Sequence, residues 1–137
     1  MVVAVAALVG AVVGKTLVQQ YFESRKGRSF ETAISEISRQ MNATLPMQVD
    51  KDTRLDSTVS GPGRRLTYLY TLVGATADDI DAAALTAAMR PQLINSYRTT
   101  PEMATLRDGA VELNYMYRDK QGRHITTMVV TPNDIGR

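Results

Sequence analysis

Hydrophobic residues recur along this chain in two different periods, one typical of helices and one typical of strands. The helical period follows Ser29, where apolar residues spaced four, three and four apart form a single stripe: Phe30, Ile34, Ile37 and Met41. Ser29 is a favourable N-cap residue for this helix. Pro46 disfavours a helical conformation at Leu45, so we expect the helix to end there.

The strand period appears in four places. Residues 64–73 and 110–118 alternate most clearly, whereas residues 53–59 alternate weakly and residues 123–131 form the last strand. Gly61-Pro62-Gly63 is a strong turn signal between the first two strands. Residues 119–122 predict a hairpin turn between the last two.

An alanine-rich stretch between these strand pairs, residues 80–97, predicts a second helix. Pro91 lies inside it and is expected to kink or split it. A short helix should begin at Pro101, with Thr100 as its N-cap, and end at Asp108-Gly109. The order is helix, two strands, helix, two strands. This order predicts an α+β fold with a four-stranded antiparallel sheet and helices on one face.

The first residues differ from the rest of the chain because residues 1–14 contain no polar side chain. A helix over residues 2–18 would be about 25 Å long, close to the hydrocarbon thickness of a bilayer. We therefore divide the chain into a membrane-anchoring helix (1–22), a linker (23–28) and a globular domain (29–137). A cleaved signal peptide and a buried core helix are alternatives for the first segment. Gly10 and Gly14 form a GxxxG pair that permits helix–helix packing in a membrane.

Positive charge is concentrated beside the apolar segment. Residues 1–28 carry a net charge of +3 within a chain of +2, so the remaining residues sum to −1. The basic residues predict contact with anionic lipid headgroups: Lys15, Arg25, Lys26 and Arg28. Nucleic-acid binding is not expected, because it requires a basic surface on the folded domain. The positive-inside rule applied to these residues would place the domain in the cytoplasm.

Catalytic chemistry has few candidates in this sequence. There is no cysteine, and the single histidine, His124, begins a predicted strand. Asp50, Asp52 and Asp56 do not match an EF-hand loop. Acidic residues at 78, 79 and 81 suit helix capping. We therefore expect no enzyme activity, no catalytic or metal-binding residues, and no cofactor.

Tyrosines give the most informative pattern in the domain. Four of them lie at period-two spacing on the two clearest strands, so they would share one sheet face if those strands pair: Tyr68, Tyr70, Tyr115 and Tyr117. Such a face can pack beneath the helices with its hydroxyls at the rim. Alternatively, it can form an aromatic surface that binds a peptide or helix of a partner.

The run of residues 45–55, LPMQVDKDTRL, resembles the signature of an uncharacterised family of small membrane-anchored bacterial proteins. Further stretches carry the same resemblance: residues 10–22, 68–72, 90–92, 100–102 and 113–115. The resemblance covers nearly the whole chain and implies a membrane anchor and a folded domain. It implies no particular activity.

The layout is also similar, more distantly, to the β-type pilotins of type II secretion. These are small periplasmic lipoproteins that bind a helix of a secretin subunit. This chain lacks their lipobox cysteine and their cysteine pair, since the matching regions read Ser96-Tyr97-Arg98 and Asn133-Asp134-Ile135. The resemblance implies a non-enzymatic interaction or assembly module at the inner membrane, with a periplasmic domain and a protein partner in an envelope complex. A cytoplasmic domain, or a domain that binds a small ligand or lipid, remains an alternative.

Overall fold

The structure is a computed structural model that describes residues 30–136. The anchoring segment, the linker and the proposed cap at Ser29 lie outside these residues. So do the residues assigned to helix packing and lipid contact: Gly10, Gly14, Lys15, Arg25, Lys26 and Arg28. Within the described range, no helix has both the length and the apolar character needed to cross a membrane.

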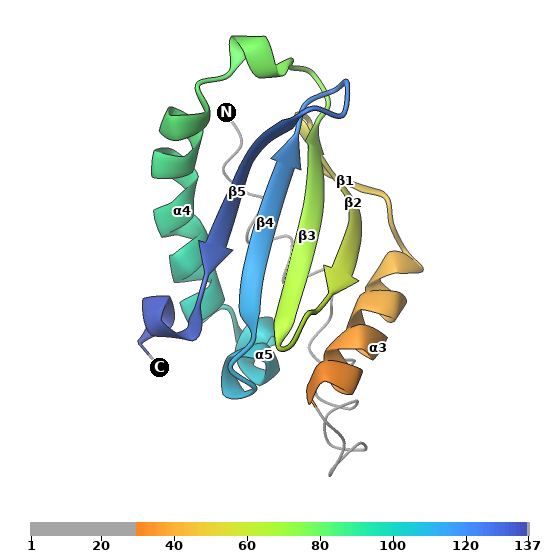
Figure 1. The fold of residues 1–137 in the computed structure, drawn as a ribbon, viewed down its shortest axis with the longest axis vertical. Coiled ribbons are helices and arrows are strands. Elements are labelled where there is room, and N and C mark those ends of the chain that lie inside the picture. Colours follow the sequence, from red (N-terminus) through yellow and green to blue (C-terminus); the bar gives the residue numbers. More distant parts are fainter. Residues whose placement is uncertain (1–29, 137) are drawn as a thin grey trace.

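Three helices and five strands make up the described chain (Figure 1). The helices are α3 (Phe30–Asn42), α4 (Ala82–Thr99) and α5 (Ala104–Asp108). The strands are β1 (Met47–Asp50), β2 (Thr53–Ser60), β3 (Arg65–Leu72), β4 (Glu112–Arg118) and β5 (His124–Val130). Short 3-10 turns η1 (Ala77–Asp79), η2 (Pro101–Met103) and η3 (Pro132–Ile135) complete the order. The α+β class expected from the sequence is therefore confirmed.

The sheet differs from the expected one in strand number and in one direction. It has five strands in the order β1-β2-β3-β4-β5, not four. Neighbouring strands are antiparallel except β3 and β4, which run parallel in the register Tyr68 to Tyr115 and Tyr70 to Tyr117. Residues 73–111 between these strands contain α4, and a connection of that length allows a crossover to a parallel neighbour. The antiparallel pairing expected within the two hairpins is confirmed, whereas the parallel β3–β4 pair makes the sheet mixed.

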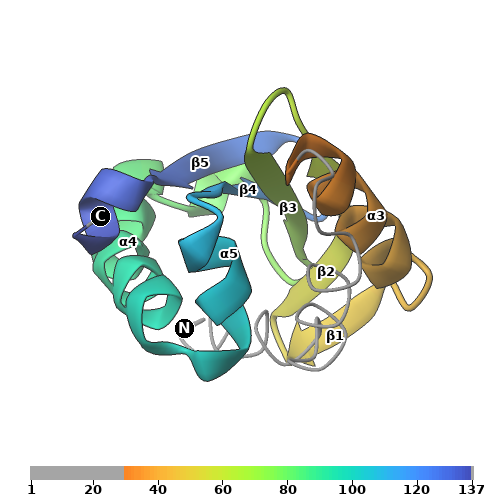
Figure 2. The same cartoon turned by 90° about the horizontal axis from the view of Figure 1, so that it is seen from below.

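Helices α4 and α5 lie on the same side of the curved sheet (Figure 2). Helix α4 is continuous through Pro91, so the expected split does not occur. Helix α3 instead runs beside β2, past the end of β1. There the Asn42 amide donates to the Thr58 carbonyl at 3.0 Å and accepts from the Thr58 N–H at 2.7 Å. The side chain thus occupies the edge that β1 leaves unpaired.

One hydrophobic core joins the sheet to all three helices. Ile34, Ile37 and Met41 of the predicted α3 stripe are buried in it. From α4, the core receives Leu85, Met89, Leu93 and Tyr97. The period-two alternation of β3 puts Leu66, Tyr68, Tyr70 and Leu72 on the same inner face.

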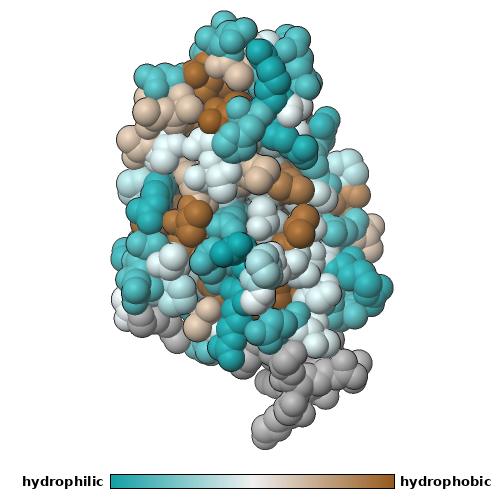
Figure 3. Space-filling view, in the orientation of Figure 1, coloured by the Kyte–Doolittle hydropathy of each residue, from teal (hydrophilic) through white to brown (hydrophobic). Residues whose placement is uncertain are grey.

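The opposite face of the sheet carries no helix among the described elements. Viewed in the orientation of Figure 1, this side is mainly hydrophilic with scattered hydrophobic residues (Figure 3). Val59 and Val129 are its exposed large apolar side chains. An ion-pair group on this face links Asp56 to Arg54 and Arg118. The molecule therefore has an apolar inner layer and a polar outer sheet face.

Candidate partner-binding site

The four tyrosines of the candidate binding face do share one side of the sheet. The parallel register places Tyr68 beside Tyr115 and Tyr70 beside Tyr117, and their ring centroids lie 5.2 and 4.8 Å apart in stacked arrangements. All four side chains are 0% exposed. They therefore form the centre of the core. A partner could reach them only after rearrangement of the surrounding chain, so the binding face remains a prediction.

Their hydroxyl groups are unusual because they have no hydrogen-bond partner within residues 30–136. The only other tyrosine in this range behaves differently, since the Tyr97 hydroxyl donates to the Val111 carbonyl at 2.7 Å. Burial raises the pKa of the four unpaired phenols well above its usual value. These groups are therefore neutral at any physiological pH and cannot act as bases.

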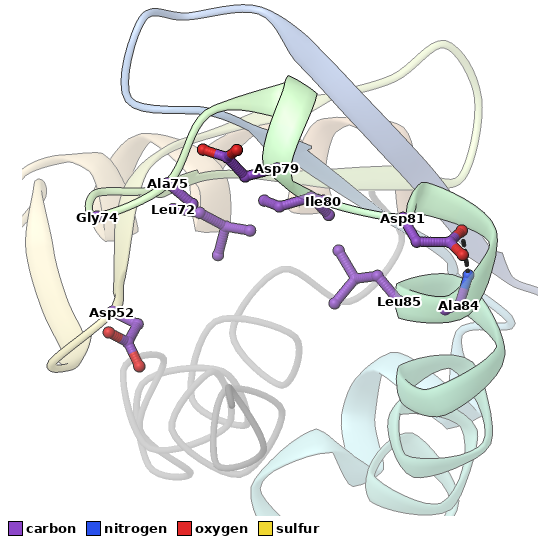
Figure 4. Close-up of a pocket in the computed structure, with 9 residues that line it drawn as sticks. All are labelled: Asp52, Leu72, Gly74, Ala75, Asp79, Ile80, Asp81, Ala84 and Leu85. Atoms are coloured by element: carbon purple, nitrogen blue, oxygen red, sulfur yellow. Dashed lines mark hydrogen bonds between the residues drawn. The ribbon is translucent and has the colours of Figure 1, made fainter.

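A pocket of about 360 Å³ opens at the end of this inner face, where β3 ends and α4 begins (Figure 4). We call it the Leu72 pocket. Leu72 and Leu85 are the buried members of its lining, and Ile80 is half-buried. Small residues make up the rest of its non-acidic lining: Gly74, Ala75 and Ala84. The local sequence therefore creates an apolar hollow by placing small side chains where β3 turns toward α4.

Three carboxylates surround the Leu72 pocket: Asp52 from the β1–β2 turn, Asp79 from η1 and Asp81 before α4. Asp81 is the N-cap of α4 and accepts from the Ala84 N–H at 3.0 Å, which fits the capping role expected from the sequence. Asp79 accepts from the Thr76 hydroxyl at 2.8 Å. Among residues 30–136, no basic residue lines the pocket.

The wall formed by residues 74–79 is held by the β4–β5 turn. Asp119 accepts from the N–H of Ala77 at 2.8 Å, and the N–H of Lys120 donates to the Ala75 carbonyl at 3.0 Å. Burial of Asp119 opposes ionisation of its carboxyl group, but hydrogen bonds to the carboxylate outweigh this effect. The donors are the backbone N–H groups of Ala77, Gln121 and Arg123 and the Arg123 side chain. They lower the pKa of Asp119 to about 2. Asp119 therefore acts as a charged clamp between two loops that are distant in sequence.

The remaining residues considered for chemistry have structural surroundings. His124 is exposed, and its Nε2 lies 2.8 Å from the Thr127 hydroxyl. Asp50 accepts from the Asp52 N–H in the β1–β2 turn, at 2.8 Å. Within residues 30–136, no group of three or more potential ligands could hold a metal ion. These residues point to no catalytic constellation in the described part of the chain.

The chain belongs to the family described as a domain of unknown function, DUF8479, whose model matches residues 29–126. No curated protein matches the chain.

Several solved structures share the fold. A protein of Pseudomonas aeruginosa, provisionally described as secreted, has a TM-score of 0.64 and 13% identity over 77% of this chain and 92% of its own. The pilotin of the Vibrio vulnificus type 2 secretion system has a TM-score of 0.58 and 14% identity, covering 79% and 93%. The type II secretion pilotin AspS of Vibrio cholerae has a TM-score of 0.59 and 11% identity, covering 82% and 98%. At these identities the likeness establishes a pilotin-like fold.

Sequence analysis missed the Leu72 pocket. Its only local signals were the small residues Gly74 and Ala75 and the acidic residues beside Ile80, which were assigned to capping. Asp52 lies more than twenty positions before the other two acidic residues, so only the fold brings it to the same rim.

Proposed function

We propose that this protein is a non-enzymatic interaction or assembly module, tethered to the bacterial inner membrane by residues 1–22. In this proposal, its domain binds a protein partner in an envelope complex, in the manner of a pilotin-like accessory. The observation that carries the proposal is the fold shared with two type II secretion pilotins.

In this proposal the tether is the apolar segment of residues 1–22, and the 137 residues contain no cysteine. Residues 1–14, which precede Lys15, contain no charged side chain, and this supports their insertion into the bilayer. The basic residues that follow are suited to contact with anionic lipid headgroups. Gly10 and Gly14 would allow the helix to pack against another membrane helix. The full chain should therefore remain with the membrane fraction after washing with high salt or carbonate.

The side of the membrane is tested by reporters fused at Arg137. The pilotin-like fold favours a periplasmic domain, which predicts an active alkaline phosphatase fusion and a dark green fluorescent protein fusion. The opposite pattern would place the domain in the cytoplasm, as the positive-inside rule indicates. It would remove the periplasmic assignment while leaving the tether intact.

The partner is tested by crosslinking in living cells, followed by purification of the full chain. We expect one subunit of an envelope complex to be enriched with the full chain. The control keeps residues 1–28 as the anchor and replaces residues 29–137 with another domain. Enrichment of no such subunit would contradict an assembly role.

A second candidate function is the binding of a small ligand or lipid, and the Leu72 pocket is the observation that favours it. Its size lies within the range of about 300–1,000 Å³ found for ligand pockets. Native mass spectrometry of the purified full chain distinguishes the candidates. A stoichiometric co-purified small molecule would favour the carrier function, and an unliganded chain would favour the assembly function.

A further inference from the structure

We propose that the Leu72 pocket binds a small soluble organic cation, in which a primary amine is attached to an apolar body. This inference goes beyond the assembly role. It rests on the second candidate function, because it presupposes a small ligand. It adds the chemical class of that ligand and names Asp52 as the side chain that recognises its charge.

The volume of the pocket limits the size of the apolar body. A cavity of about 150 Å³ holds one benzene molecule. The Leu72 pocket measures about 360 Å³, so a benzene-sized ring with a short alkyl chain fits inside it. A bilayer lipid with two acyl chains is much larger than this space. The ligand is therefore expected to be a small molecule dissolved in water rather than a lipid of the membrane.

Aliphatic side chains supply the contacts for this body. Leu72 and Leu85 are buried and Ile80 is half-buried, while Gly74 and Ala75 leave space between them. A Cβ added at Gly74 would meet no heavy atom of the described residues within 4 Å, so this wall has room for a ligand. Burial of apolar ligand surface in this hollow would provide the main favourable contribution to binding.

Negative charge on the rim defines the head group of the ligand. Two of the three acidic lining residues already have partners, since Asp81 caps α4 and Asp79 accepts a hydrogen bond from Thr76. The Asp52 carboxylate differs, because within residues 30–136 it makes no hydrogen bond and no ion pair. It is therefore available to accept a charge-assisted hydrogen bond from an ammonium group.

Basic residues close to this turn do not occupy the carboxylate. Lys51 precedes Asp52 in the β1–β2 turn, but it is exposed and is not among the residues that line the pocket. Arg123 is already paired with Asp119 and Asp78. The charge of Asp52 is thus left for a ligand that carries its own cation.

The arrangement of the pocket places the two parts of the ligand. Asp52 lies across the pocket from Asp81, and the aliphatic side chains lie between them (Figure 4). The N-terminus of α4, which carries partial positive charge, lies on the Asp81 side and disfavours a cation there. The ammonium group should therefore lie beside Asp52, with the apolar body directed toward α4. The Asp119 clamp fixes the 74–79 wall in advance, which reduces the ordering cost of binding.

The test uses three ligands that share a phenylbutyl body and differ only in the head group, which is an amine, an alcohol or a carboxylate. The full chain is held in phosphatidylcholine nanodiscs, and saturation-transfer NMR titrations are corrected with empty nanodiscs. We expect the amine, with about eleven non-hydrogen atoms, to bind in the millimolar range or tighter. The alcohol should bind roughly two- to fivefold more weakly at low salt. The carboxylate should bind more weakly than the alcohol, because the rim repels it.

Removing the charge of Asp52 tests the recognition of the head group. Asp52→Asn should lower the affinity for the amine to that for the alcohol and leave the affinity for the alcohol unchanged. Glu31→Gln, on the exposed first turn of α3, should keep the wild-type preference for the amine. Retained binding of the alcohol shows that the pocket of the Asp52 variant is intact.

Filling the pocket tests the location of the site. Ala84→Leu should weaken binding of the amine by at least about tenfold. Ala87→Leu should not, because Ala87 is also exposed on α4 but does not line the pocket. Both changes are compatible with a helix, since leucine is a strong helix former. Circular dichroism spectra should confirm that both variants fold.

Equal binding of the amine and the alcohol by the wild type would overturn the proposal, as would failure to bind the amine. So would an unchanged preference in Asp52→Asn or wild-type binding by a folded Ala84→Leu variant. Native mass spectrometry of the chain purified from cells separates this proposal from the function on which it rests. A stoichiometric ligand without an amino group would reject the amine class and keep the carrier function. An unliganded chain that binds none of the three ligands would reject the carrier function as well.

Discussion

Among the buried tyrosines, the hydroxyl group distinguishes one residue from the rest. The Tyr97 hydroxyl donates to the Val111 carbonyl, so its burial replaces a hydrogen bond to water with one to the protein. The inner-face tyrosines have no such compensation within the described residues: Tyr68, Tyr70, Tyr115 and Tyr117. Their rings contribute apolar area and stacking, whereas their hydroxyls oppose folding.

This difference leads to opposite expectations for the same substitution. Tyr97→Phe removes a made hydrogen bond and should lower the free energy of unfolding by about 1 kcal/mol. Tyr68→Phe removes a buried hydroxyl that has no partner among residues 30–136, so the free energy of unfolding should stay unchanged or rise by up to about 1 kcal/mol. Urea titration of the two variants and the wild type measures both effects. A loss in Tyr68→Phe equal to that in Tyr97→Phe would mean that the Tyr68 hydroxyl has a partner.

At this scale the sequence predicted which tyrosines share a face but not their surroundings. Period-two spacing alone places Tyr68 with Tyr70 and Tyr115 with Tyr117. Burial depends on what α4 and α5 bring over the sheet, and local alternation contains no information about that. The hydroxyl partners depend on the same tertiary contacts.

Among the elements, α3 was predictable and β1 was not. The α3 stripe covers three turns of helix, whereas β1 has only four residues, follows Pro46 and leads into the Asp50-Lys51-Asp52 turn. The four residues of β1 do alternate between apolar and polar, but four is the shortest run in which alternation indicates a strand. The parallel pairing of β3 with β4 was missed for another reason. Strand direction across a long connection is set by tertiary packing, and only the hairpins have a local sequence signal.

The contact between α3 and β2 has its own prediction. β1 pairs with β2 only as far as Leu55, so the backbone of Thr58 would be unpaired on that edge without Asn42. Asn42→Ala should lower the free energy of unfolding by about 1 kcal/mol or more, because two backbone groups lose their partner. Asn95→Ala, an exposed control on α4, should change it by less than about 0.5 kcal/mol.

Thermal or urea unfolding of the full chain measures both variants. Hydrogen exchange adds a local readout, since the Thr58 N–H should exchange faster in Asn42→Ala than in the wild type. Similar stability of the Asn42 and Asn95 variants would mean that α3 is held to the β2 edge by apolar packing alone.

For the molecule as a whole, Asp119 connects the β4–β5 turn to the loop that forms the pocket wall. Its pKa in the folded protein is about 2, below the usual value of 3.8. A carboxyl whose pKa is lowered by folding stabilises the folded state above its unfolded pKa. That contribution decreases as the pH falls from about 4 and is lost below about 2. The wild type should therefore lose stability across this pH window.

Asp119→Asn should lower stability at pH 7 and should reduce the loss of stability between about pH 4 and 2, because it removes the titrating group. Gln121→Ala is the matched control. It keeps the backbone N–H that donates to Asp119 and should retain the wild-type pH dependence. Urea titrations of the three proteins from pH 7 to pH 2 measure the slopes. Parallel curves for the wild type and Asp119→Asn would mean that acid unfolding proceeds through other carboxylates.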